Sequence, residues 1–136
     1  MKTIHRKRLA KLADYLDTVP RKLFKFNLVV KEGTCGTVGC AIGHSVKVFP
    51  RLLSYDPALD RVVTKNEHAM WYRDIAMEIF GMTNHQAGGV FGPDNQRDEL
   101  GRKYSNLGGN ATPKQVAKLI RKFLNDPDQK LSLIHI

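Results

Sequence analysis

The apolar residues near the start of the chain recur at the spacing of a helix. Leu9, Leu12, Ala13 and Leu16 fall on one face, and lysines and arginines occupy the other. This pattern predicts an amphipathic helix over residues 4–18. A proline two residues later ends it, because proline cannot continue the helical hydrogen-bond ladder.

Three further helices are predicted from apolar stripes or from the residues expected at their ends. The clearest stripe lies in residues 67–80, with Gly81 as the C-cap. Thr83 is the expected N-cap of a short helix that ends at Val90. The last helix begins with the N-cap and N1 proline Thr112-Pro113, and its apolar face consists of Val116, Leu119, Ile120, Phe123 and Leu124.

The middle of the chain is predicted to be less regular. Residues 24–30 alternate and then become apolar, which favours a short strand. A further helix is expected over residues 37–48. Residues 51–65 are expected to be irregular apart from a short strand at residues 61–64, and residues 93–110 form a long polar loop.

These elements predict a mainly α fold, a compact domain of about five helices with at most a small two-stranded sheet. Residues 1–128 form a single domain by this interpretation. Residues 129–136 are expected to be a non-native tail, since the string LSLIHI resembles translated sequencing-adapter read-through. The alternative is a genuine apolar strand, or a tail that docks on the body.

Composition adds charge to this picture. The 136 residues carry 22 Lys and Arg against 13 Asp and Glu, a net charge of +9, and residues 1–31 alone carry +7 (nine cations less two acids). Such a field attracts nucleic acid, nucleotides or an acidic protein face, although charge also serves solubility alone. With two cysteines, no signal peptide and no long apolar run, we expect a soluble cytoplasmic protein in a reducing compartment.

The segment 35–44, CGTVGCAIGH, carries the most chemical information. Gly36 and Thr37 stand at the start of the helix expected over residues 37–48. They suggest a helix N-terminus that binds an anion, with His44 as a further ligand-binding residue. The competing interpretation is core packing, with both cysteines as small buried hydrophobes. A zinc site built on Cys35, Cys40 and His44 lacks the four ligands that structural zinc needs, and a Cys–His nucleophile lacks an orienting partner.

Two other segments suggest contact with a ligand. Trp71 and Arg73 lie off the apolar stripe of their helix, where they would stack on a nucleobase or cover the edge of the domain. The loop cations would clamp a phosphate or remain solvated. The candidate ligand-binding residues are Gly36, Thr37, His44, Trp71, Arg73, Arg97, Arg102 and Lys103. No catalytic residue, metal or cofactor is predicted, because no paired carboxylates or complete ligand set converge.

The order of motifs gives a resemblance to a family. The strings CGTVGCAIGH, FGMT, VFGP and TPKQV occur in succession between residues 9 and 124. They resemble small uncharacterised proteins of tailed phages and prophages with the pattern CGT-x-x-C-A-x-G, FG-[LM]-T, [LV]-FGP and TP-x-x-V. The resemblance brings no established catalytic residues.

Phage accessory proteins of this size often oppose host defence, which suggests a function by analogy. The expected function is that of a homo-oligomeric protein that sequesters a phosphorylated nucleotide-derived immune signal, cyclic ADP-ribose-like or a cyclic dinucleotide, without catalysis. The alternatives are a basic nucleic-acid-binding protein and an inhibitor that binds an acidic host protein. An enzyme ranks last.

Overall fold

The computed structural model describes five helices, one 3-10 turn and four short strands. The described residues are 2–24, 30–31, 38–39, 41–56, 58, 61–65, 72–91 and 111–126. The predicted loop at 93–110 and the tail at 129–136 lie outside them. The mainly α prediction is confirmed.

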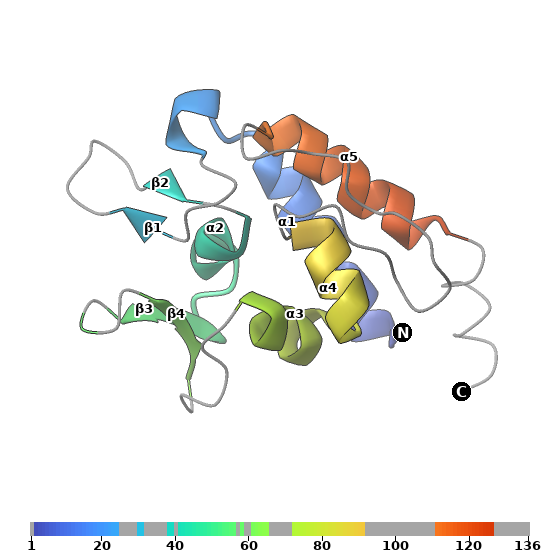
Figure 1. The fold of residues 1–136 in the computed structure, drawn as a ribbon, viewed down its shortest axis with the longest axis horizontal. Coiled ribbons are helices and arrows are strands. Elements are labelled where there is room, and N and C mark those ends of the chain that lie inside the picture. The colour runs from blue at the N-terminus through green and yellow to red at the C-terminus, as the bar shows by residue number, and fades with distance from the viewer. Residues whose placement is uncertain are drawn as a thin grey trace.

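Helix α1 (Thr3–Leu16) lies against three other helices and organises the core. Its four apolar residues, Leu9, Leu12, Ala13 and Leu16, are completely buried, as their spacing predicted. The helix itself packs against α5 (Pro113–Leu124), α2 (Ala41–Val48) and α3 (Tyr72–Phe80), and Figure 1 shows α1 beside α5. Burying each of the three leucines contributes about 2 kcal/mol, so α1 supplies a large share of the hydrophobic stabilisation.

Helix α5 forms because its ends and its apolar stripe agree. Thr112 is the N-cap, and its hydroxyl accepts a hydrogen bond from the Gln115 backbone N–H at 3.2 Å. The Gln115 side chain in turn accepts from the Thr112 N–H at 2.8 Å, which completes a capping box. The stripe that begins at Val116 packs on α1, and the two helices run antiparallel.

Helix α4 (Asn84–Phe91) repeats this N-terminal arrangement. The Thr83 hydroxyl accepts from the Gln86 N–H at 3.2 Å, and the Gln86 side chain accepts from the Thr83 N–H at 2.9 Å. The N-cap prediction at Thr83 is therefore confirmed. Gly81 separates α3 from this cap with a φ of 63°, a left-handed conformation that ends α3 and that glycine adopts without steric cost.

The strands form two separate antiparallel ladders. β1 (Val30–Lys31) pairs with β2 (Val38–Gly39), and β3 (Leu53–Asp56) pairs with β4 (Arg61–Thr64). The predicted strand at residues 61–64 is confirmed. Its partner β3 lies where irregular chain was expected, because a four-residue segment with one buried side chain carries too weak an alternation to be recognised.

The predicted helix over residues 37–48 is wrong at its start. Val38 and Gly39 belong to β2, and α2 begins at Ala41. The physical reason is the glycine content before residue 40, since glycine disfavours a helix interior by about 1 kcal/mol relative to alanine. The helix N-terminus expected at Gly36 and Thr37 is therefore displaced along the chain.

An aromatic chain completes the core beneath α1. Phe80 contacts Phe49 edge-on at 5.8 Å between ring centroids, and contacts Phe91 at 5.7 Å. These rings join the end of α2 to α3 and α4. Within the described residues, no helix combines the length and the apolar character needed to cross a membrane.

The α3–α4 junction gives a stability prediction. A Cβ atom at residue 81 would collide with the His5 ring on α1, with 2.7 Å to Cγ, and would also sit at an unfavourable positive φ. We expect Gly81→Ala to lower the free energy of unfolding by about 2–3 kcal/mol, measured by urea denaturation.

The same substitution in a His5→Ala background separates the two costs. Without the imidazole the collision disappears, so the cost of Gly81→Ala should fall to about 1 kcal/mol from the backbone alone. An identical cost in both backgrounds would contradict the contact between His5 and residue 81.

Candidate functional site

His44 was expected to line a ligand site, and the structure places it inside the core. Its side chain is 2% exposed, on α2. The ring stacks on Phe24 at 6.0 Å between centroids and lies 6.1 Å from the Tyr15 ring. Its Nε2 lies 2.8 Å from the Leu23 carbonyl oxygen, to which it donates in the neutral form. His44 therefore ties α2 to the 3-10 turn Arg21–Leu23.

The other nitrogen of this ring has no hydrogen bond. Nδ1 of His44 is buried and has no partner. Burial lowers the pKa of His44 below 6.5, the Leu23 carbonyl opposes this effect, and the positive charge of Lys47 adds to it. The imidazole is thus held neutral and closed off from solvent, which suits a structural role better than ligand contact.

Arg73, the other predicted residue within the described part of the chain, contacts its own neighbour. Its Nε donates to the Tyr72 hydroxyl at 3.0 Å, and its guanidinium lies 5.6 Å from the centre of the Tyr72 ring. Both side chains are half-buried. This pair at the start of α3 is a stacked cation and ring.

The remaining predicted site residues and both cysteines lie outside the described residues. The site residues are Gly36, Thr37, Trp71, Arg97, Arg102 and Lys103, and the cysteines are Cys35 and Cys40. Within the described part of the chain, no three His, Cys, Asp or Glu side chains gather as a metal site would require.

Two arginines of α1 bind the ends of other helices. Arg6 Nη2 donates to the Leu124 carbonyl at 2.5 Å, and Arg8 Nη1 donates to the Ile79 carbonyl at 3.0 Å. These carbonyls belong to the last turns of α5 and α3, where the helix lacks its own donors and the macrodipole is negative. Part of the basic charge predicted to attract a partner is therefore structural.

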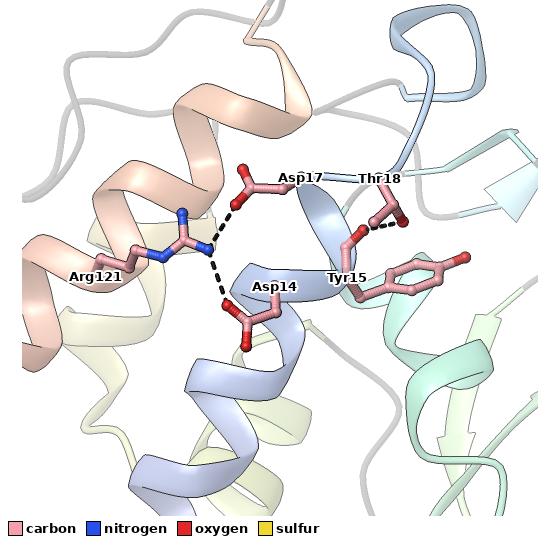
Figure 2. Close-up of polar contacts among 5 residues, drawn as sticks. All are labelled: Asp14, Tyr15, Asp17, Thr18 and Arg121. Carbon is pink, nitrogen blue, oxygen red and sulfur yellow. Dashed lines mark hydrogen bonds and ion pairs between the residues drawn. The ribbon is translucent and has the colours of Figure 1, made fainter.

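Arg121 on α5 is also engaged. Its Nη2 donates to Asp17 at 2.6 Å and to Asp14 at 3.0 Å, so that one guanidinium joins two turns of α1 (Figure 2). The hydrogen bond to Asp17 raises the pKa of Arg121 most, and the hydrogen bond to Asp14 raises it further. These groups are substantially exposed, and their contribution to stability is correspondingly small.

The lysines of these two helices are placed differently. All are exposed, and no ion pair within the described residues involves them. On α5 they recur at every fourth position, which puts them in one row. On α1, two lie at i and i+4 on the outer face, and one of these, Lys11, also lies 5.8 Å from the Phe49 ring. The set consists of Lys7 and Lys11 on α1 and Lys114, Lys118 and Lys122 on α5, here named the lysine face.

The lysine face contains no residue of the predicted site, although part of its signal was present in the sequence. Residues 113–124 contain three lysines and an arginine and no acid. The lysine spacing of four is as visible as the apolar spacing that predicted the helix. What the sequence does not reveal is that α1 and α5, which carry these lysines, pack side by side.

The burial of His44 predicts an acid-sensitive fold. The unfolded chain takes up a proton near pH 6.5 and the folded chain only at lower pH, so stability falls as the pH drops below about 6.5. His44→Gln retains a donor for the Leu23 carbonyl and removes the titration. The variant should reduce the slope of the free energy of unfolding against pH by up to about 1.4 kcal/mol per pH unit, measured by urea unfolding between about pH 8 and pH 5.

His5 contributes in the same direction, because burial and then Arg8 lower its pKa as well, so some dependence persists in the variant. If His44→Gln left the pH dependence of the unfolding free energy as steep as in the parent protein, the inference that His44 is buried in its neutral form would be wrong.

Comparison with known proteins gives no relative from which to transfer a role. No protein-family model, curated protein or solved structure matches the chain. The resemblance to a phage protein family stays a prediction, and function has to be inferred from the described side chains themselves.

Proposed function

We propose that this protein binds nucleic acid, with the lysine face contacting the phosphate backbone. The observation that supports it is the division of cations on α1 and α5. Arg6, Arg8 and Arg121 are held by carbonyls or carboxylates, whereas the five lysines are exposed and make no ion pair in the described part of the chain. Exposed, unpaired lysines are the groups that release counterions when they neutralise phosphates.

The geometry of the α5 row suits a strand of phosphates. Lys114 and Lys122 are eight residues apart, which corresponds to about 12 Å along a helix axis. The phosphates of one DNA strand rise by about 3.4 Å each, so the row spans about three to four of them. Lysine is a flexible point charge that suits backbone contact, and it carries no base preference of its own. Binding of this kind is largely independent of sequence.

Sequestration of a nucleotide-derived signal has less support from the described residues. Of the eight residues predicted for it, six lie outside them, His44 is buried, and Arg73 is engaged with Tyr72. It stays a prediction. A free nucleotide offers one to three phosphates, whereas the lysine face spreads its charges over two helices.

Removing the α5 row tests the proposal. The triple variant Lys114→Gln, Lys118→Gln, Lys122→Gln should weaken duplex DNA binding and reduce the slope of log K against log salt by about 2–3, since each phosphate contact contributes about 0.9. Fluorescence anisotropy at several salt concentrations measures both quantities.

A charge-matched control removes three exposed cations elsewhere: Lys47→Gln, Arg51→Gln and Lys65→Gln, from α2 and the ends of the β3–β4 ladder. This variant has the same net charge, and its salt slope should stay close to that of the parent. Equal losses in both triple variants would show that only overall charge matters and would contradict a defined face. If the parent protein did not bind duplex DNA, the proposed nucleic-acid function would be wrong.

A further inference from the structure

A groove runs between the start of α1 and the end of α5. Its volume is about 390 Å³, and it is lined by Thr3, Arg6, Lys7 and Ala10 of α1 and by Leu124 of α5. The four α1 residues lie at i, i+3, i+4 and i+7, which places them along one side of that helix. The lining contains two cations and a hydroxyl, and it contains no carboxylate.

The Arg6 guanidinium is fixed in this groove but not saturated. Nη2 is held by the Leu124 carbonyl, while Nη1 is buried and has no hydrogen-bond partner. A guanidinium has five N–H donors in a planar fork, and an unsatisfied buried donor is costly. The bond to Leu124 also offsets the negative end of α5, which would otherwise repel an anion.

We propose that this groove binds a phosphate group, with the Arg6 guanidinium, the Lys7 ammonium and the Thr3 hydroxyl as its donors. Arg6 supplies a pre-oriented fork, and charge-assisted bonds of this type are the strong ones. The groove has a volume of about 390 Å³ and is open to solvent, so it has room for a phosphate group. The inference deepens the proposed function and rests on it for one source of the phosphate, the strand backbone; the other source is a free phosphate ester.

An NMR titration with inorganic phosphate, with chloride balancing the ionic strength, tests the groove directly. Saturable shifts are expected for the backbone amides of Thr3, Arg6 and Lys7. Lys7→Gln should weaken phosphate binding about tenfold, the loss expected from one charge-assisted bond. Lys7 is exposed, so its replacement leaves the fold intact.

The matched control is Lys47→Gln, which removes an exposed lysine of the same charge from α2, outside both the groove lining and the lysine face. It should change phosphate affinity by less than about twofold. Thr3→Ala provides a second variant without any charge change and should weaken binding by a smaller factor than Lys7→Gln. Equal weakening by Lys7→Gln and Lys47→Gln, or no saturable shift at these three amides, would contradict phosphate binding in the groove.

A second arm adds short duplex DNA, or a mononucleotide, in place of phosphate. Duplex-induced shifts at the same amides support the backbone as the source of the bound phosphate. Shifts with phosphate and the mononucleotide but none with duplex would support phosphate binding in the groove and contradict the nucleic-acid function. Duplex binding that is sensitive to Lys118→Gln, with no phosphate response at the groove, would support the nucleic-acid function and contradict phosphate binding in the groove.

Discussion

The burial of α1 is the constraint on which the rest of the structure depends. Its apolar face is fully buried, and α2, α3 and α5 all pack against it. Its polar groups fix the same neighbours, since Arg6 and Arg8 bind the last turns of α5 and α3, and Asp14 and Asp17 hold Arg121. The helix is therefore held on its apolar side by hydrophobic contact and at its edges by hydrogen bonds.

This arrangement divides the positive charge into two kinds. The arginines of α1 and α5, whose planar forks suit carbonyls and carboxylates, lie at the contacts between helices. The lysines of these two helices, which are more strongly hydrated, are exposed. A high net charge alone does not distinguish a binding surface from helix capping, but the partners of each cation do. The arginines of these helices stabilise the fold, and the lysine face supplies the exposed cations that a ligand could contact.

Helices with strong periodicity and end signals could be predicted from the sequence. The stripe of α1, the Thr83 and Thr112 caps and the Gly81 C-cap are local features, and each was recognisable before the fold was known. The start of α2 and the strand β3 could not be predicted, because short glycine-rich or half-buried segments take their conformation from tertiary partners. Of the predicted site, six residues lie outside the described residues, His44 is buried, and Arg73 contacts Tyr72, so the site stays a prediction. The lysine face could not be predicted, because it depends on two helices that are about 100 residues apart in the chain.

In the proposed complex, nucleic acid contacts the exposed sides of α1 and α5. The most direct test is to map the backbone amides that are perturbed when duplex DNA is added to isotope-labelled protein. We expect perturbations concentrated around Lys7, Lys11 and the row Lys114, Lys118 and Lys122, with the β3–β4 ladder unaffected. Perturbations centred on α2 and Arg73 instead, or none at all, would contradict this proposal.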